Sequence, residues 1–580
     1  MTVPLERGSI FVDLKKYKYE NGVANTLRKL NFNVNKGEFV GLMGRTGAGK
    51  TTSLMLLNGL IPHFFEGEFD GKIIANTMNT ARYRIQTLAR FIGFVMQDPE
   101  TQIFGITVEK DVAFGPSNLA YGKEKIKELV GKSLNAVGLS GYEKRITTEL
   151  SGGEKQRLAI AGILAMEPEI LVLDEPTSEL DPSGRKEIYK LLSNLGKSSG
   201  VTILISGHDS EEMLEFSDRI LVLDNGTIFW DGKPSALFQD IELLEKLGIR
   251  PPEAAEISYR LVKEKILPSG SIFINNDEFV RYFTSNYKFE NKNHTNDESK
   301  QKKADDDIAI EARNLNFVYS NGKHALRNIN LKICKGEFVA LIGKNGAGKT
   351  TFSKHLNGLY RPTEGQIFIN GKDIAGISTA ELSHSVGYVF QNPDHQIFAA
   401  SVWEEVAFGL KNLHLTDEAR GKRITDALEF VGLGDFKERH PFMLGKGERQ
   451  KLAVATILAM EPDILVIDEP TTGQDWDGTK RMMNMMEKLH KKGHTILAIT
   501  HNMRLAAEYA DRVIVFANGQ VVLDGKPEEV FYQQEILESA FVTPPDSVLI
   551  ASRLRQSEWT KYPVTVKDIQ LLFTDNGDEN

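Results

Sequence analysis

The sequence contains a single cysteine, Cys334, among its 580 residues. One cysteine excludes an internal disulfide framework, and it also excludes a zinc site or an iron–sulfur cluster built on several thiolates. We expect Cys334, which lies in the segment LKICKGEF, to be buried in the core.

Long apolar runs and an excess of basic residues are also missing. No segment approaches the roughly 18 apolar residues of a membrane-spanning helix, and residues 1–9 lack the apolar region of a signal peptide. The 70 Lys and Arg residues are outnumbered by 79 Asp and Glu residues, and the resulting net charge of −9 gives no overall field that favours nucleic acid. Since 41% of the residues are hydrophobic, we expect a globular protein in the cytoplasm that reaches a membrane only through partners.

What the sequence does contain is one phosphate-binding motif, twice. GRTGAGKTT and GKNGAGKTT both fit G-x-x-x-x-G-K-[ST], and each follows an apolar run, 39–43 or 338–342, that predicts a strand. A strand, a glycine-rich turn and a helix N-terminus together aim backbone N–H groups at a polyphosphate. The predicted ATP-binding residues of the two loops are Gly44, Arg45, Thr46, Gly47, Ala48, Gly49, Lys50, Thr51 and Thr52, and Gly343, Lys344, Asn345, Gly346, Ala347, Gly348, Lys349, Thr350 and Thr351.

Within each loop, two side chains have separate roles. The ammonium of Lys50 or Lys349 would reach the β- and γ-phosphates, and the hydroxyl of Thr51 or Thr350 would hold Mg²⁺. Two such loops in one chain predict two molecules of Mg-ATP.

The halves repeat almost from end to end, which predicts a tandem duplication. Short β-rich runs alternate with helical segments in each half, so we expect two α/β domains with mainly parallel, covered sheets. Each half ends in a Pro-Pro turn before an amphipathic helix pattern, and a polar segment between the halves reads as a flexible linker. The predicted divisions are a first domain at 1–240, its appendage at 241–284, the linker at 285–307, a second domain at 308–533 and its appendage at 534–580.

A second chemical motif closes a buried strand in each half, as ILVLDEP and as ILVIDEP. Asp174 and Asp468 would help to hold Mg²⁺, and the next residues, Glu175 and Glu469, are placed to orient or deprotonate the attacking water. A strand that simply ends in solvated acids would look the same in isolation. The pairing with a phosphate-binding loop in both halves favours the catalytic interpretation.

The segment LSGGEKQR, just upstream of the first of these strands, resembles the signature of ABC transporter ATPases. Nearly the whole chain is similar to two fused ABC nucleotide-binding domains. The resemblance implies two P-loop α/β domains, each with a helical subdomain, that form a head-to-tail sandwich without a second copy of the chain. Each ATP then lies between the P-loop of one domain and the signature of the other, here Ser151, Gly152 and Gly153.

The same resemblance assigns further residues. Gln97 and Gln391 match the Q-loop residues that contact Mg²⁺ and couple to the membrane partner, and His208 and His501 match the switch histidines that contact the γ-phosphate. Catalysis is thereby assigned to Glu175 and His208 in one half and to Glu469 and His501 in the other. Tyr19 and Tyr319 match the aromatic residue that stacks on adenine, with Tyr17 as the alternative to Tyr19 and a core tyrosine as the alternative role.

The second signature departs from the family, since it reads LGKGERQK. Gly445 replaces the serine and Lys446 replaces the first glycine, so two contacts to the γ-phosphate are altered at once. In the head-to-tail arrangement the half with Glu469 faces the intact signature and forms a competent site. The half with Glu175 faces the altered signature and forms an impaired site, unless both substitutions are tolerated.

The segments after Gln97 and Gln391, QDPETQIFGITVEKDVAFG and QNPDHQIFAASVWEEVAFG, resemble those of energy-coupling factor (ECF) importers of vitamins or metal ions. This implies a peripheral ATPase on the cytoplasmic face of the membrane, bound to an integral coupling protein and a substrate-binding membrane subunit. The docking groove would lie around 102–104 and 396–398. We further expect arginines on the helices of the coupling protein to pair with nearby carboxylates, which are Glu109, Asp111, Glu404 and Glu405.

Three alternatives remain open. A fused sugar-importer ATPase usually has degenerate catalytic motifs throughout one half, whereas here both P-loops and both Asp-Glu pairs are intact. A soluble ABC-F translation ATPase needs a long basic linker for ribosomal RNA, and a DNA-repair or chromosome ATPase needs coiled coils or zinc modules. The sequence favours transport, but it does not identify the solute.

Overall fold

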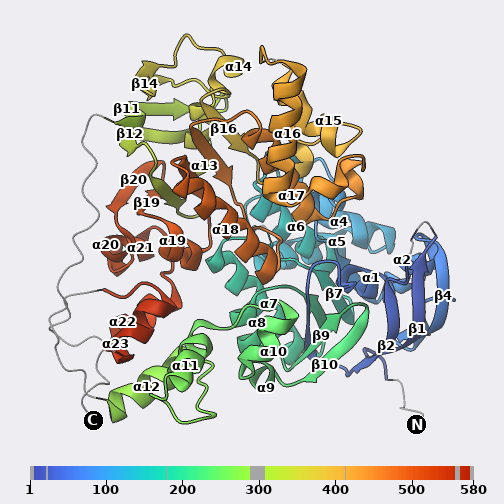
Figure 1. Cartoon of the computed structure of the whole chain (residues 1–580). Helices are drawn as coiled ribbons and strands as arrows, with labels where there is room; N and C mark the ends of the chain where they lie inside the picture. The colour runs from blue at the N-terminus through green and yellow to red at the C-terminus, as the bar shows by residue number, and fades with distance from the viewer. Residues whose placement is uncertain are drawn as a thin grey trace. The chain divides into compact units, whose positions relative to one another are not determined.

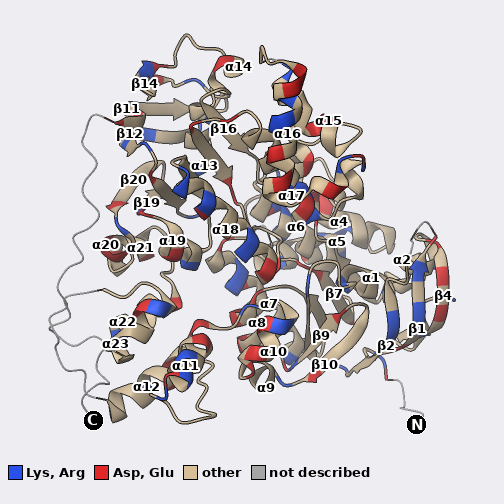
Figure 2. Ribbon diagram, viewed as in Figure 1, with Lys and Arg blue, Asp and Glu red and all other residues tan. Residues whose placement is uncertain are grey.

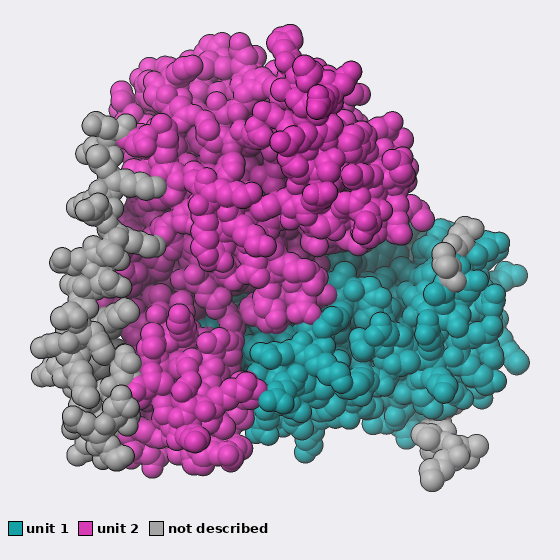
Figure 3. Space-filling model, in the orientation of Figure 1, with its two compact units in different colours: residues 1–255 teal, residues 256–580 magenta. Residues whose placement is uncertain are grey.

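A computed structural model describes residues 6–20, 22, 24–178, 180–287, 307–411, 413–554 and 562–574. The chain divides into two compact units, residues 1–255 and residues 256–580 (Figure 3). The boundary falls inside one helix, α11 (Glu253–Lys263), so the predicted first appendage is shared between the units. Most of the predicted linker, 288–306, lies outside the described residues.

The main sheet of unit 1 has six strands in the order β10-β9-β3-β8-β7-β6 (Figure 1). All neighbours are parallel except β9 and β10, and every residue of β3, β7 and β8 is buried, as expected for a sheet covered on both faces. The strand predicted at 39–43 is confirmed as β3. The six strands are β3 (Phe39–Met43), β6 (Ile92–Val95), β7 (Ile170–Asp174), β8 (Thr202–Ser206), β9 (Arg219–Asp224) and β10 (Thr227–Gly232).

A second, antiparallel sheet of unit 1 has the order β2-β1-β4-β5. Apolar side chains alternate along its strands, so one face packs into the core beside β3 while the other faces solvent. The first unit therefore has the two sheets of a P-loop domain with its glycine-rich turn between them. These strands are β1 (Ile10–Tyr19), β2 (Leu27–Val34), β4 (Gly67–Ala75) and β5 (Met78–Asn79).

The helices of unit 1 include a group of three, α4, α5 and α6, that pack against one another. This group is the predicted helical subdomain, and its α6 starts at the first signature. Among the remaining helices, α1 contacts β7 and α7 contacts β8 of the six-stranded sheet. The bounds are α1 (Lys50–Met55), α2 (Leu60–His63), α3 (Ile85–Leu88), α4 (Val108–Asn118), α5 (Lys123–Ala136), α6 (Gly152–Leu164), α7 (Pro182–Ser199), α8 (Ser210–Phe216), α9 (Pro234–Phe238) and α10 (Ile241–Leu247).

Unit 2 repeats both sheets, as β16-β17-β18-β13-β19-β20 and as β12-β11-β14-β15. The prediction of two tandem α/β domains is therefore confirmed, and so is the strand predicted at 338–342, which is β13. Cys334 ends β12 and is half-buried, so the expectation that it lies in the core was wrong. The strands are β11 (Ile308–Val318), β12 (His324–Cys334), β13 (Phe338–Ile342), β14 (Glu364–Ile369), β15 (Lys372–Asp373), β16 (Val386–Val389), β17 (Ile464–Asp468), β18 (Thr495–Ile499), β19 (Arg512–Ala517) and β20 (Gln520–Gly525).

The helices of unit 2 repeat those of unit 1, and α15, α16 and α17 form its helical subdomain. Acidic and basic residues are interspersed on α16 and α17 (Figure 2). No helix among the described residues combines the length and the apolar character needed to cross a bilayer. The bounds are α13 (Lys349–Leu356), α14 (Thr379–Leu382), α15 (Val402–Leu410), α16 (Asp417–Val431), α17 (Lys446–Leu458), α18 (Trp476–Lys491), α19 (Met503–Tyr509), α20 (Pro527–Val530) and α21 (Gln534–Ser539).

Four further helices belong to the two predicted appendages: α11 and α12 (Asn276–Asn286), and α22 (Asp546–Leu554) and α23 (Val566–Thr574). Within unit 2, α12 packs against α22. Aromatic side chains fill the contact, since the ring of Phe573 lies 4.4 Å from that of Phe283 and 6.4 Å from that of Phe279. The segment 256–286 is therefore packed with the C-terminal helices of the chain.

Candidate functional site: two phosphate-binding loops with their carboxylates

The candidate site of unit 1 lies at the carboxyl ends of three neighbouring strands. The strand order places β8 between β3, which leads into the phosphate-binding loop, and β7, which ends at Asp174. Because the three strands are parallel, the residues that follow them meet at one edge of the sheet. This edge is where residues far apart in the sequence come together.

The phosphate-binding loop itself depends on close backbone approach. Gly44 has φ 140°, and a Cβ at this position would lie 2.1 Å from the carbonyl oxygen of Leu223, so only glycine fits. Lys50 is buried, and its Nζ donates to the carbonyl oxygens of Gly44 at 2.8 Å and Arg45 at 3.2 Å. The ammonium of Lys50 is thus held inside the turn, where its positive charge would pair with a bound phosphate.

Three further polar side chains meet at Glu175, whose φ of 45° is itself uncommon for a non-glycine residue. Its Oε1 lies 3.3 Å from Nε2 of His208 and 3.8 Å from Nζ of Lys50, and its Oε2 accepts a hydrogen bond of 2.9 Å from Nε2 of Gln97. The structure thus brings three of the predicted site residues to the carboxylate of a fourth. The roles of these residues remain predictions.

Asp174 is the most deeply buried carboxylate of this group, with 2% of its surface exposed. Burial raises its pKa, while hydrogen bonds from Ser206 and Thr51 oppose the rise. The Ser206 hydroxyl donates to Oδ1 at 2.6 Å and accepts from the backbone N–H of Glu175 at 3.0 Å. Ser206 was not predicted, although its place at the end of β8, paired with Asp174 at the end of β7, could have indicated it.

Unit 2 repeats this arrangement. Nζ of Lys349 donates to the carbonyl oxygens of Gly343 at 2.5 Å and Lys344 at 3.1 Å, and Nε2 of His501 lies 3.4 Å from Oε1 of Glu469. Gln391 follows β16 by two residues, as Gln97 follows β6.

One contact of unit 2 differs from that of unit 1. The carboxylate of Asp468 accepts a hydrogen bond of 3.1 Å from the hydroxyl of Tyr388, which comes from β16 and is also 3.1 Å from Oγ of Ser353. Burial raises the pKa of Asp468, against hydrogen bonds from Tyr388 and Thr350. No sequence signal indicated Tyr388, because the matching position of the first half is Phe94.

The two candidate adenine-stacking tyrosines lie beside the loops. The hydroxyl of Tyr19 is 3.1 Å from Oγ1 of Thr52, and that of Tyr319 is 2.8 Å from Oγ1 of Thr351. Tyr17, the alternative to Tyr19, is fully buried and its hydroxyl bonds to the backbone of Phe65. This geometry favours Tyr19 as the residue available to a base.

The two signatures differ in their local structure. Ser151 is the N-cap of α6, where its Oγ accepts from the backbone N–H of Glu154 at 3.4 Å, and none of its hydrogen bonds reaches the P-loop of unit 1. Gly445 occupies the same position before α17 but has no side chain to cap the helix. A Cβ built on Gly473 would meet Nζ of Lys446 at 2.8 Å, so the lysine lies against this glycine.

The donor set suits magnesium. Thr51, Gln97 and Asp174 in unit 1, and Thr350, Gln391 and Asp468 in unit 2, offer only hydroxyl, amide and carboxylate oxygens, which are the ligands of a hard cation. The hydrogen bonds of Asp174 and Asp468 to Thr51 and Thr350 show that these donors lie close to one another in each unit. Bound there with ATP, Mg²⁺ would neutralise phosphate charge.

Each unit also exposes a pair of aromatic rings after its Q-loop glutamine. Phe104 and Phe114, 72% and 54% exposed, have ring centres 5.9 Å apart, and Phe398 and Phe408 have ring centres 4.6 Å apart. Large rings exposed in pairs indicate an interaction surface. The sequence singled out 102–104 and 396–398 but missed Phe114 and Phe408, which lie further along on α4 and α15.

Two of the four carboxylates expected to face a partner turn inward instead. Asp111 accepts backbone hydrogen bonds of 2.8 Å from Phe104 and from Gly105, and Glu405 accepts 2.9 Å and 2.7 Å bonds from Phe398 and Ala399. Both carboxylates are buried, and their hydrogen bonds stabilise the turn that carries the exposed ring. That expectation was wrong for these two, whereas Glu109 and Glu404 are exposed.

Comparisons with known proteins agree with this geometry. The ABC transporter family model matches residues 27–178 and 326–472. A protein of Methanosarcina acetivorans that carries the provisional name ABC transporter ATP-binding protein is 44% identical, over 93% of this chain and 89% of its own. A protein of Caldanaerobacter subterraneus with the same provisional name is 40% identical, over 93% of this chain and 95% of its own.

Among solved structures, CbiO1 of Clostridium perfringens, described as part of the ABC transporter complex cbiONQ, is 37% identical. It covers 40% of this chain and 94% of its own, with a TM-score of 0.38.

Proposed function

Because the chain belongs to the ABC transporter family, as an ATP-hydrolysing subunit with two nucleotide-binding domains, we propose that it powers an ECF-type importer of a vitamin or a metal ion. The observation that carries this proposal is the pair of exposed aromatic rings after each Q-loop glutamine, Phe104 with Phe114 and Phe398 with Phe408. These lie in the segments whose sequences resemble those of ECF importers. The chain would sit on the cytoplasmic face of the membrane through these surfaces.

The proposed partners are an integral membrane coupling protein and a substrate-binding membrane subunit. Helices of the coupling protein would insert apolar side chains between the exposed rings, and their arginines would meet the exposed Glu109 and Glu404. Gln102 connects this surface to the site, since its side chain bonds to the backbone of Phe94 and Met96, one residue before Gln97.

In the proposed hydrolysis, each residue acts by position and charge. Lys50 and Lys349 bind the β- and γ-phosphates, and Tyr19 and Tyr319 stack on adenine. Glu175 and Glu469 orient the attacking water and take its proton, while His208 or His501, within about 3.4 Å of that carboxylate, contacts the γ-phosphate.

We propose further that the two ATP sites are unequal. In the head-to-tail sandwich of this family, ATP at Lys349 would face Ser151, Gly152 and Gly153, whereas ATP at Lys50 would face Gly445 and Lys446. The second signature lacks the serine hydroxyl, and its lysine occupies the space beside Gly473. The site with Glu469 would therefore turn over and the site with Glu175 would hold ATP for longer.

The first test is to purify the chain in mild detergent from the membranes of its own source and to identify its companions by mass spectrometry. A multi-helix coupling protein with a small hydrophobic subunit is the expected result. Periplasmic-binding-protein partners would favour a fused sugar importer. Ribosomal proteins without any integral membrane protein would overturn the transport assignment.

A further inference from the structure

A buried arginine follows the candidate switch histidine of unit 2. Arg504 lies in the first turn of α19, three residues after His501, and only 6% of its surface is exposed. A cation in the first turn of a helix opposes the helix dipole, and a buried charge is costly unless it is paired. The position of Arg504 therefore depends on its partners.

These partners come from α18 and from the part of α11 that belongs to unit 2. Nη2 of Arg504 donates to Oε2 of Glu256 on α11 at 2.6 Å, and its guanidinium lies 4.9 Å from the ring centre of Trp476, the first residue of α18. Nε also donates to Glu508 within α19 at 2.9 Å. One side chain thus ties the start of α19 to α11 and to the start of α18.

The carboxylate of Glu256 is held by two cations. Burial alone would raise its pKa, but Arg504 and Arg260 together hold the pKa of Glu256 below its usual range. Nη2 of Arg260 donates to Oε1 at 2.7 Å, so each oxygen of Glu256 has its own guanidinium. The pair is therefore ionised at neutral pH and geometrically fixed. Residues of both charge signs lie along α11 (Figure 2).

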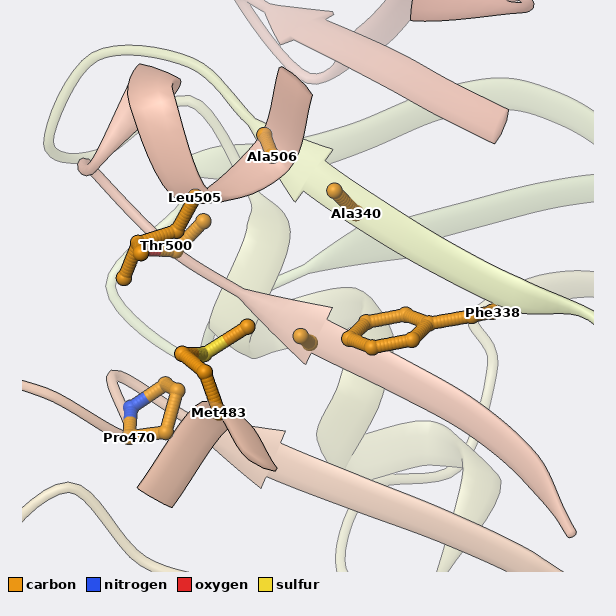
Figure 4. A pocket seen from close by; sticks show the side chains of 8 residues that line it. Phe338, Ala340, Pro470, Met483, Thr500, Leu505 and Ala506 are labelled. Carbon is orange, nitrogen blue, oxygen red and sulfur yellow. The ribbon is translucent and has the colours of Figure 1, made fainter. Parts of the chain in front are cut away.

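Apolar side chains also support the first turn of α19, since Met503, Leu505 and Ala506 are buried in the core. A small pocket lies beneath it, lined by side chains of β13, α18 and α19 that include Ala340, Met483, Leu505 and Ala506 (Figure 4). Thr500, immediately before His501, lines the same pocket. The hydrogen bonds of Arg504 add directional polar contacts to this apolar support.

A similar ion pair is present in unit 1, where the acidic residue lies on the helix after the histidine and the arginine is its partner. Glu211 lies in the first turn of α8, three residues after His208, and is paired with Arg250. The hydroxyl of the adjacent Ser210 donates to the carbonyl oxygen of Arg250. Arg250 and Glu256 belong to one short stretch of chain, so the helix after each histidine is bound by the same stretch.

We propose that Glu256 is a positioning residue for ATP hydrolysis, which acts through Arg504 to hold the loop that carries His501. The inference rests on the proposed role of His501 at the γ-phosphate. It assigns to the stretch 250–256 a role in orienting the switch histidines, with Arg250 acting in unit 1 as Glu256 acts in unit 2.

The test uses the purified full chain and measures kcat and KM for MgATP. Because a displacement of about 1 Å can cost up to about 100-fold in rate, we expect Glu256→Gln to lower kcat by about 3- to 10-fold with KM changed less than about twofold. In a His501→Ala background, Glu256→Gln should lower the residual kcat no further. Asp277→Asn, which breaks the exposed 2.6 Å pair between Arg553 and α12, is the matched control and should leave kcat unchanged.

The outcomes distinguish the proposed role of His501 at the γ-phosphate from the positioning role of Glu256. A His501→Ala chain with normal kcat would show that the proposed role of the histidine is wrong. If His501→Ala is impaired but Glu256→Gln keeps its rate, or if the two losses multiply, the positioning role is overturned. Glu256→Asp keeps the negative charge, so a kcat between those of Glu256→Gln and the unmodified chain supports the inference. If Glu256→Gln fails to fold, Glu256→Asp takes its place in the same comparisons.

Discussion

Nε2 of Gln97 donates a 2.9 Å hydrogen bond to Oε2 of Glu175, which joins the Q-loop of unit 1 to the carboxylate at the end of β7. The next residues, 98–102, lead to the exposed ring of Phe104. A short stretch of backbone and one hydrogen bond therefore connect the aromatic surface to the carboxylate. If the proposed partner docks on this surface, the connection gives a physical basis for coupling between docking and hydrolysis.

The proposed inequality of the two sites predicts different effects of the same substitution. Loss of a general base typically lowers a rate by about 10²- to 10⁴-fold at the site concerned. If most turnover occurs at the site with Glu469, Glu469→Gln lowers total ATPase activity by at least about 10-fold, whereas Glu175→Gln leaves roughly half or more. Steady-state phosphate release from each purified variant measures this, and equal losses would contradict the inequality.

The exposed rings predict a docking defect without a catalytic one. Phe104→Ala with Phe114→Ala, and Phe398→Ala with Phe408→Ala, remove side chains that contribute little to the core because they are largely exposed. We expect each pair to weaken recovery of the membrane partners by about 10-fold, since buried aromatic anchors carry much of the energy of an interface. The ATPase rate of the isolated chain should stay within about twofold.

The control for this docking experiment is Phe229→Ala on β10, another exposed ring that lies outside both segments. Its variant should recover the partners at the level of the unmodified chain. Equal loss with this control, or no loss with the two pairs, would show that the aromatic surfaces do not dock the partner.

Much of this site was predictable because glycine-rich turns and strand-end carboxylates are local patterns. Two motifs, GRTGAGKTT and ILVLDEP, indicate which segments lie at the carboxyl edge of the sheet. The strand order then brings Lys50, Glu175 and His208 together. The inward turn of Asp111 and Glu405 was not predictable, because an exposed and a buried acid look alike in sequence. The contact between Glu256 and Arg504 joins residues 248 positions apart without any motif.

A cluster of charged residues on α7 and at the start of α8 predicts a dependence of stability on pH. Glu212 is half-buried beside Asp209 and Glu211, and desolvation raises its pKa to about 7, although Arg185 opposes the rise. Arg185 itself pairs with Asp209 at 2.8 Å. Because the folded-state pKa lies above the unfolded value of 4.5, Glu212 is protonated in the folded chain but ionised in the unfolded chain between about pH 4.5 and 7.

This proton is lost from the folded state as the pH rises through about 7, so the contribution of Glu212 to stability falls over that window and stays unfavourable above it. Glu212→Gln should therefore match the unmodified chain at pH 5 but melt at a higher temperature at pH 8. Thermal melts at both values measure the difference. Glu215→Gln, at an exposed position on the same helix, is the control and should show no such rise in melting temperature at pH 8. A rise equal to that of Glu212→Gln would contradict the assignment of the effect to Glu212.

Repair of the second signature gives the last prediction. Gly445→Ser with Lys446→Gly restores the serine before α17 and removes the side chain that lies against Gly473. An N-cap serine is only a few tenths of a kcal/mol better than glycine, so the repair should barely change the melting temperature. Its effect on catalysis should be larger, because the hydroxyl and the open backbone would both serve the γ-phosphate of the ATP at Lys50.

The repair is best measured in the Glu469→Gln background, where the remaining turnover comes from the site with Glu175. We expect the double change at 445 and 446 to raise that remaining rate by about 10²-fold, the lower end of the effect of one restored transition-state hydrogen bond. Adding Glu175→Gln should then abolish the gain, since it removes the base of the repaired site. A gain that survives Glu175→Gln would place the recovered activity elsewhere, and no gain at all would mean that the signature is not what limits this site.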